Sequence, residues 1–390
     1  FVIGVVIEPI KHEFHLTDTE LGAVGGLAHA IAYSAFVLPV GWLLDRTNRV
    51  KLLAAMLGIW SMITALGALA TGFWFLFLMR MGVGAAESAS SPASQSLVAS
   101  IFPIKERAGA MGLVFAGTAV GTGFVFAIGG PIAEYYGWRA VFLVVGVPGV
   151  LLALFMWFFL AEPPRSAEGD AVEQPAPMLH ACKFFFSSRP AFFATMGSMI
   201  VAMNIASIWT WTAPILIREQ GFSLAYAGVI IGIAAGLIKF AASILSGFLG
   251  DRIAKGRINR LWIVPAIALV LTVPIGFGIS FAPNQYVAVA LVMALGLTMG
   301  AHYAAPKTIV MSVTQPNMRG SVAAVEQLVI NLFGVSVGPL ITGAISDYLG
   351  GDVSLAMAAT LSFNIFAALA FWYSTGAMPD DATDPKMAHA

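Results

Sequence analysis

Charged residues are scarce in this chain of 390 residues: Asp, Glu, Lys and Arg make up 10% of it, whereas a soluble domain carries about 25%. Because 59% of the residues are hydrophobic, too few polar side chains remain to cover a surface that faces water. The apolar runs are long enough for membrane-spanning helices rather than barrel strands. We therefore expect an all-α integral membrane protein.

Other absences exclude whole classes of function. Cysteine occurs once, as Cys182, which rules out an internal disulfide framework and a cysteine-rich metal site. A Gly-x-x-x-x-Gly-Lys-Ser/Thr loop is missing, which argues against an ATP-driven pump. A His-Glu-x-x-His zinc motif does not occur either. Acidic and basic residues number 20 each, so charge gives no reason to expect a nucleic acid. We expect no enzyme, no cofactor and no metal.

Twelve apolar runs predict twelve transmembrane helices. The first, "FVIGVVIEPI", is too short to cross roughly 30 Å of hydrocarbon, so we expect a truncated first helix. The predicted helices cover residues 1–10, 19–44, 50–70, 73–102, 106–133, 139–161, 191–216, 225–250, 260–281, 285–312, 319–346 and 353–374.

A polar stretch with several prolines divides these runs into two groups of six. It covers residues 162–190 and is predicted to be a linker. We expect one six-helix bundle over residues 1–161, a second over 191–374, and a disordered tail over 375–390.

The basic residues predict the orientation in the membrane. Of the 20 Lys and Arg residues, 14 fall in one set of loops with the linker and tail, three in the opposite loops, and three inside predicted spans. Because Lys and Arg concentrate in cytoplasmic loops, we expect the linker and the tail to be cytoplasmic.

The sequence also repeats itself. "GWLLDRTNRVK" follows the second predicted helix and "GFLGDRIAKGR" follows the eighth, and the same offset of 206 aligns Gly41 with Gly247 and Asp45 with Asp251. Two six-helix halves in parallel repeat are one architecture of secondary transporters, whose substrate site lies near mid-membrane.

The first of these loops, "GWLLDRTNR", resembles the signature loop of the major facilitator superfamily, Gly-x-x-x-Asp-Arg-x-Gly-Arg, with Asn48 in place of the second glycine. The resemblance implies the major facilitator fold. We expect the loop to act as a conformational gate; the alternative is that its charges only anchor the cytoplasmic face. The predicted gate residues are Gly41, Asp45, Arg46, Arg49, Asp251, Arg252 and Glu326.

A narrower resemblance covers most of the first half. "EPIKHEFHLTDTELGAVGGLAHAIAYSAFVLPVGWLLDRTNR", "RMGVGAAESASSPASQSLVASIFP" and "GWRAVFLVVGVPGVLLAL" are similar to the Spinster-type branch. This resemblance implies proton-linked movement of lysophospholipids or sphingoid phosphates.

Polar residues inside the fourth run point to a site. At 100° per residue, Arg80, Gly84, Glu87, Ser91 and Ser94 share one narrow face of the predicted helix. Glu87 falls close to mid-membrane, where a charge is costly and normally serves a function. We expect Glu87 to carry the coupling proton, with Arg80 as its modulator or an anion anchor, and Ser91 and Ser94 to line the cavity. A static Arg–Glu pair is the alternative.

Further candidates for the substrate cavity come from other runs. For Lys239, anion binding competes with a structural ion pair to Glu326; for His302, a second proton site competes with a packing role. Trp209 and Trp211 fit either a cavity wall or the interfacial belt of tryptophans. The remaining candidates are Asn204, Thr118 and Thr122.

We conclude that the sequence predicts a secondary active transporter of an amphiphilic anion, either a lipid or an organic anion, working by proton-coupled alternating access. A proton-coupled multidrug antiporter and an uncoupled lipid facilitator or scramblase are the alternatives. The expected partners are the small substrate, protons and membrane lipids. We expect a monomer in a bacterial inner membrane.

Overall fold

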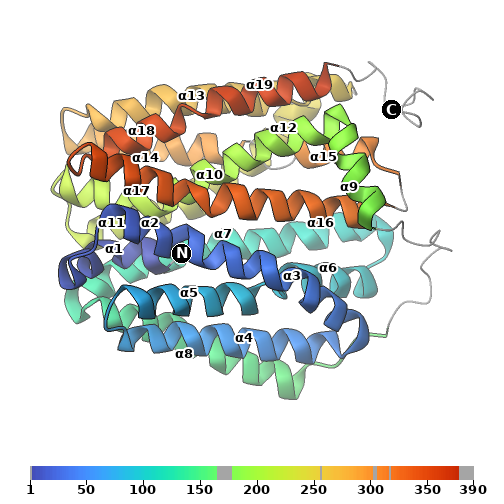
Figure 1. The fold of residues 1–390 in the computed structure, drawn as a ribbon, viewed down its shortest axis with the longest axis horizontal. Coiled ribbons are helices and arrows are strands. Elements are labelled where there is room, and N and C mark those ends of the chain that lie inside the picture. The colour runs from blue at the N-terminus through green and yellow to red at the C-terminus, as the bar shows by residue number, and fades with distance from the viewer. Residues whose placement is uncertain (1, 165–177, 255–256, 302–304, 316–317, 377–390) are drawn as a thin grey trace.

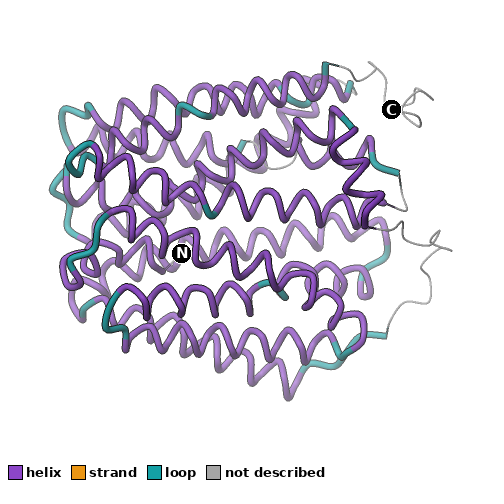
Figure 2. The backbone as a smooth tube through the Cα atoms, viewed as in Figure 1, coloured by secondary structure: helices purple, strands orange, loops and turns teal. Residues whose placement is uncertain are grey.

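The computed structural model describes residues 2–164, 178–254, 257–301, 305–315 and 318–376, and this part of the chain consists of helices and short connections (Figures 1 and 2). Each of the twelve predicted segments corresponds to one helix or to a consecutive group of helices. In chain order the helices are α1 (Val2–Phe14), α2 (Asp18–Gly22), η1 (Ala23–Leu27), α3 (Ala28–Arg46), α4 (Arg49–Leu66), η2 (Gly67–Leu69), α5 (Phe73–Glu87), α6 (Ser90–Ile101), α7 (Ile104–Tyr136), α8 (Trp138–Phe159), α9 (Met178–Ser187), α10 (Arg189–Arg218), α11 (Leu224–Gly232), η3 (Ile233–Ile238), α12 (Lys239–Ala254), η4 (Ile258–Arg260), α13 (Ile263–Ser280), α14 (Gln285–Gly300), α15 (Ala305–Val313), α16 (Arg319–Val329), η6 (Ile330–Val335), α17 (Val337–Tyr348), α18 (Val353–Leu361) and α19 (Asn364–Thr375).

Nine helical stretches of the described residues are long and apolar enough to cross a membrane, which confirms the all-helical membrane fold. They are Asp18–Leu44, Arg49–Leu69, Gly109–Tyr136, Trp138–Phe159, Arg189–Arg218, Leu224–Ala254, Ile263–Ser280, Ser321–Tyr348 and Val353–Thr375. Gln285–Gly300 is a shorter apolar helix.

Local sequence signals explain where several helices begin and end. Thr17 and Glu20 form a capping box at the start of α2, each side chain bonding the other's backbone N–H. The side chain of Asn48 caps α4 by accepting from the Lys51 amide. Gly137, with φ of +82°, separates α7 from α8, because that backbone conformation suits a residue without a Cβ.

The helices form two groups that lie side by side (Figure 1). Within residues 2–159, α4 packs mainly on α8 and α3 on α5; within residues 189–375, α10 packs on α19 and α13 on α14. We call the end at which α3, α8 and α12 finish the basic end, because it carries Arg46, Arg49 and Arg252.

The two groups contact each other chiefly toward the end opposite the basic end. There α2 packs on α17, and α7 packs on α11 and η3. Small residues allow the second contact: a Cβ on Gly123 would lie 2.8 Å from the Cα of Gly236, and one on Gly228 would lie 2.6 Å from the carbonyl oxygen of Phe126. Small residues that let helices approach closely are typical of packing between membrane helices.

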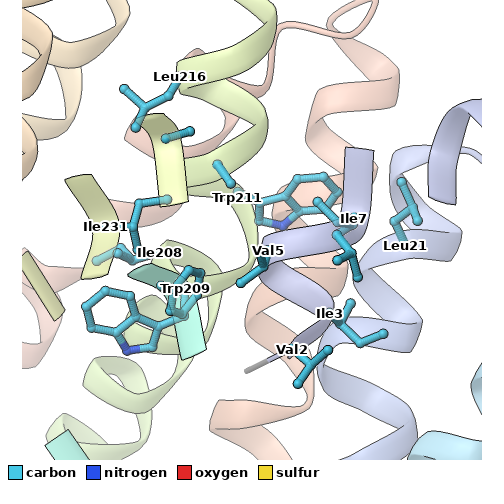
Figure 3. Packing of buried hydrophobic residues seen from close by; sticks show 14 of the residues in the cluster. Val2, Ile3, Val5, Ile7, Leu21, Ile208, Trp209, Trp211, Leu216 and Ile231 are labelled. Carbon is cyan, nitrogen blue, oxygen red and sulfur yellow. The ribbon is translucent and has the colours of Figure 1, made fainter. Parts of the chain in front are cut away.

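The largest hydrophobic cluster lies across this contact. It joins Val5 and Ile7 of α1 to Ile208 and Trp211 of α10 and Ile231 of α11, as Figure 3 shows. All five side chains are at most 2% exposed. The protein is therefore packed across the two groups at this end.

Three spans contain a π-helical turn, in which the hydrogen bonds reach one residue further than in an α-helix. These turns are η1 between α2 and α3, η3 between α11 and α12, and η6 between α16 and α17. Such turns occur frequently at functional sites in proteins. Asn331 lies within one of these turns, and Lys239 and His29 follow theirs by one and two residues.

The predicted linker, residues 162–190, contains a helix that the sequence did not indicate. This helix, α9, buries Ala181 and Phe185 against α10 and α16 while Leu179 and Phe186 stay exposed. It runs across the direction of the spans at the basic end (Figure 1).

Candidate functional site

Glu87, the residue predicted to carry the proton, faces His29 of α3. Its Oε2 lies 2.9 Å from His29 Nε2, and the side chains are 44% and 17% exposed. His29 is not among the residues predicted from the sequence. The signal that could have found it is its position inside a long apolar run, where an ionisable residue is costly.

A close approach of two helices creates this pair. A Cβ on Gly84 of α5 would collide with the carbonyl oxygen of His29, so only glycine allows α5 to lie against α3 at this point. Glu87 follows three residues later on the same face of α5. The glycine that the sequence placed in the polar stripe thus serves as the contact point.

Arg80 lies two turns before Glu87 and is half-buried. Its Nε donates to the carbonyl oxygen of Val24 at 3.4 Å. Val24 belongs to the π turn η1, in which the amide of Ala28 bonds the carbonyl of Ala23 instead of that of Val24. The π turn therefore leaves the Val24 carbonyl as an acceptor for the arginine.

The helix that carries Glu87 ends directly after it. The sequence predicts one helix over 73–102, but α5 ends at Glu87 and α6 begins at Ser90. Pro92 explains the break, because it has no N–H to bond the carbonyl of Ser88, four residues earlier. At the same break, the Ser88 hydroxyl donates to the Ala85 carbonyl at 2.7 Å.

The break separates the predicted stripe into two parts. Ser91 and Ser94 belong to α6, where Ser91 is exposed and accepts a hydrogen bond from Gln95 at 3.0 Å, and Ser94 is half-buried. Because α5 and α6 are separate helices, the angles of one helical wheel do not give the positions of Ser91 and Ser94 relative to Glu87. Their role as cavity residues stays a prediction.

In the second group of helices, Lys239 directly follows the π turn η3. Its Nζ lies 5.3 Å from the ring centroid of Trp209, within the range of a cation–π contact. The Trp209 ring is 7% exposed and lies 6.2 Å from the ring of Phe126 (Figure 3 shows Trp209). A cation and a buried aromatic surface therefore meet here.

Asn204 and Trp211 are fully buried. The Asn204 amide donates to Asn364 Oδ1 at 2.6 Å, and Trp211 Nε1 donates to the Pro339 carbonyl at 3.1 Å. Both tryptophan side chains are thus buried in the protein, and the choice between a cavity wall and the interfacial belt stays a prediction. In this conformation Trp211 packs α10 against α17.

Other predicted cavity residues are dispersed. Thr122 is buried and bonds the Thr118 carbonyl at 2.8 Å, while Thr118 is exposed. His302 lies outside the described residues. Glu326 of α16 is buried, and its pairing with Lys239 stays a prediction.

At the basic end, the predicted gate residues Arg46 and Arg49 form side-chain hydrogen bonds within the first group of helices and to the start of the linker. Arg46 donates to the Trp42 carbonyl at 3.3 Å and stacks 4.2 Å from the Trp42 ring centroid. A Cβ on Gly41 would meet nothing within 4 Å, and Arg252 is exposed. The side chains of Asp45 and Asp251 lie outside the described part of the chain. The gate role stays a prediction.

Arg49 has a different position from the other gate residues. It is buried, and its Nε lies 2.6 Å from Glu162 Oε1. Its other nitrogens donate to the Ser100 hydroxyl at 2.6 Å and to the Pro163 carbonyl at 2.9 Å. Arg49 thus attaches the start of the predicted linker to α4 and α6.

A charged cluster at the opposite end joins the two groups of helices. Arg218 of α10 lies 2.8 Å from Glu8 Oε2 and 2.9 Å from Asp18 Oδ2. Asp18 is fully buried and also bonds Lys11 at 2.5 Å and Ser346 at 2.7 Å. These residues have no predicted role, because only the folded chain brings positions 8, 18 and 218 together.

Comparison with known proteins assigns the chain to a family. The sequence model of the Major Facilitator Superfamily matches residues 1–335. An "MFS-type efflux pump" of Mycolicibacterium smegmatis is 29% identical over 90% of this chain and 82% of its own length. A "D-galactonate transporter" of Escherichia coli is 27% identical over 89% and 85%. "Protein spinster homolog 1" of Xenopus laevis is 25% identical over 90% and 70%.

Among solved structures, the chain is similar to a bacterial homolog of the human lysosomal transporter Spinster, described as inward-facing and unoccupied. The TM-score is 0.85 at 24% identity, over 96% of this chain and 92% of the other. At this level of sequence identity, the structural similarity shows that the two chains share a fold.

Proposed function

The chain belongs to the Major Facilitator Superfamily, and we propose that it moves an amphiphilic anion across the membrane by proton-coupled alternating access. Membership makes it a secondary transporter and not an enzyme. The finer statements on coupling, cargo and orientation are our proposal.

The observation that carries the proposal is the Glu87–His29 pair beside Arg80. A carboxylate and an imidazole 2.9 Å apart can exchange a proton with water when the carboxylate is reachable, and the Glu87 side chain is 44% exposed. Protonation of Glu87 would neutralise the carboxylate that faces His29 and leave the charge of Arg80 without its neighbour. Binding of a proton is thus linked to the contact between α3 and α5.

The charges around the site favour an anionic cargo. Arg80 and Lys239 are intramembrane cations, one in each half, and Lys239 lies beside the buried Trp209 ring. Cations attract an anionic group, and the aromatic surface suits an apolar chain. Two cargoes fit: a lysophospholipid or sphingoid phosphate, as the Spinster resemblance implies, and an organic anion, as the similarity to a D-galactonate transporter favours.

Two alternatives have support of their own. The similarity to an efflux pump favours a proton-coupled multidrug antiporter. An uncoupled lipid facilitator or scramblase is the alternative from another class. Two intramembrane cations argue against a cationic drug, because like charges in a site of low dielectric repel strongly.

The proposal includes the orientation and the division of the chain. The basic end, the linker over 162–190 and the tail over 375–390 face the cytoplasm of a bacterial inner membrane. The bundles over 1–161 and 191–374 rock about the central site. The structure corresponds to the state in which the end opposite the basic end is sealed.

The test is uptake into proteoliposomes under an imposed pH gradient, with a panel of lysophospholipids, sphingoid phosphates and D-galactonate. We expect one class to accumulate with the gradient, and Glu87→Gln to abolish this dependence. Glu13→Gln is the matched control, because it removes a carboxylate that pairs with Arg139 outside the site. Proton-dependent uptake that survives in Glu87→Gln would refute the coupling role.

Two further results separate the alternatives. Lys239→Ala should impair anionic but not cationic cargo, whereas loss of cationic transport would favour the multidrug antiporter. Transport of the cargo at the same rate with and without a pH gradient would establish the uncoupled facilitator.

A further inference from the structure

A shallow apolar groove lies on the outer surface of the second group of helices, away from the Glu87 site. It has a volume of about 360 Å³ and runs between α10 and α19. Its lining is apolar and aromatic throughout: Phe193, Phe366, Leu369, Ala370, Trp372 and Tyr373. Phe366 and Trp372 are 60% and 54% exposed, so in a membrane the groove faces hydrocarbon.

A cation lies at the mouth of this groove. Arg189, the first residue of α10, is exposed and places its guanidinium 3.5 Å from the ring centroid of Tyr373. Because α10 begins at the basic end, the guanidinium lies at the level where the hydrocarbon gives way to headgroups. Stacking on Tyr373 holds it over the groove and leaves its N–H donors free to face an anion.

The linker helix α9 adds a second cation and an apolar edge. The ring centroid of its Phe186 lies 6.1 Å from that of Phe192. The ring centroid of Phe192 lies in turn 5.3 Å from that of Phe193 in the groove wall. Lys183 is exposed one turn before. A helix that lies across the ends of the spans with exposed apolar side chains and an exposed lysine fits a position in the membrane interface.

We propose that the groove and α9 form a binding site for an anionic phospholipid of the leaflet at the basic end. Arg189 and Lys183 bind the phosphate-containing headgroup, and one acyl chain lies along Phe193, Leu369 and Tyr373. Basic residues at the membrane surface attract anionic headgroups. The occupant is a lipid rather than a soluble anion, because the apolar groove continues from the cations into the hydrocarbon region.

This site is separate from the transport site. Arg189 and Lys183 are not among the residues that we assign to proton coupling, cargo or gate. The bound lipid is therefore a ligand that holds the linker helix at the membrane surface, and the proposal stands whichever cargo the protein moves.

The test uses the purified full chain and native mass spectrometry, with phosphatidylglycerol and phosphatidylcholine that carry identical acyl chains. We expect the wild type to retain phosphatidylglycerol preferentially. Each of Arg189→Gln and Lys183→Gln should lower that retention about fivefold, the effect of one basic residue near a membrane surface. Arg257→Gln is the matched control, because it removes an exposed basic residue of the α12–α13 connection.

A second variant tests the groove without changing charge. Ala370→Trp fills it, and we expect retention of phosphatidylglycerol to fall while the elution profile stays that of a folded protein. Excess inorganic phosphate should not displace the lipid.

Three outcomes would overturn the proposal: equal retention of the two lipids by the wild type, an equal loss in Arg257→Gln and Arg189→Gln, or full displacement by inorganic phosphate. The last would show a site for free anions.

Discussion

At the scale of single residues, Gly84 determines how closely the two helices of the Glu87 site approach each other. Its Cα faces the backbone of His29, and any side chain there must push α5 away from α3. The consequence reaches Glu87, because the distance of 2.9 Å to His29 depends on the same contact.

We predict that Gly84→Ala lowers the thermal midpoint of unfolding in detergent. Overpacking of a tight contact typically costs about 1–3 kcal/mol. Gly117→Ala on α7 is the matched control, since a Cβ there meets nothing within 4 Å and alanine is the better helix former. Equal midpoints for the two variants would show that the contact is not tight in the membrane protein as purified.

Some residues of this site can be predicted from the sequence, and others cannot. Arg80 and Glu87 stand out, because a charge inside an apolar run has few explanations. His29 does not stand out, because a neutral histidine also serves as a hydrogen-bonded packing residue. Only the distance between α3 and α5, which no sequence pattern reports, identifies it as the partner of Glu87.

At the scale of elements, the predicted segments coincide with helices, whereas their interruptions were missed. Hydrophobic periodicity and length predict a span well, since about 20 apolar residues are needed to cross the bilayer. The break after Glu87 could have been inferred from Pro92. The π turns could not, because η1, η3 and η6 are stabilised by contacts between helices and have no signature in the sequence.

The attachment of the linker to α4 is an element-scale contact with a pH dependence. Partial burial raises the pKa of Glu162, but the Val50 amide and the Arg49 guanidinium outweigh this, so its pKa lies below the usual 4.5. The ionised carboxylate is the form that the folded protein favours. Its contribution to stability is therefore present above about pH 4.5 and is lost as the pH falls through the lowered pKa.

We predict that Glu162→Gln lowers the thermal midpoint at neutral pH, and that this difference from the wild type shrinks as the pH falls below about 4.5, because protonation removes the charge that Arg49 binds. Glu106→Gln, an exposed carboxylate near the start of α7, is the control for general charge effects. A difference between wild type and Glu162→Gln that persists at low pH would contradict the role of the ionised form.

At the scale of the whole molecule, the repeat in the sequence predicts two similar halves but not which end they close. Arg218 of one half holds Glu8 and Asp18 of the other, and α2 packs on α17 around them. Alternating access requires two arrangements of nearly equal free energy, and a small difference between them is not encoded in any local pattern.

We predict that Arg218→Gln shifts the protein toward the state that is open at this end. Removing Arg218 leaves the buried Glu8 without its arginine and leaves Asp18 with Lys11 and Ser346, which costs up to about 3–5 kcal/mol in the closed state alone. The measurement is the distance between spin labels at positions 136 and 286, in a background in which Cys182 is replaced by serine. Longer distances should gain population.

Arg139→Gln is the control for that experiment, since it breaks an ion pair with Glu13 at the same end but within one half. Identical distance distributions in wild type and Arg218→Gln would show that the charged cluster does not hold the two halves together.

The three π turns also bear on how such spans should be compared between relatives. Each one accommodates a single extra residue without unravelling the helix, and it offsets the angular position of everything that follows by about 100°. A helical wheel drawn through a whole span therefore mixes two registers. Against a relative that lacks one of these turns, a one-residue gap at Ala23–Leu27, Ile233–Ile238 or Ile330–Val335 keeps the positions of His29, Lys239 and Asn331 equivalent. An ungapped alignment with such a relative would compare residues on different faces.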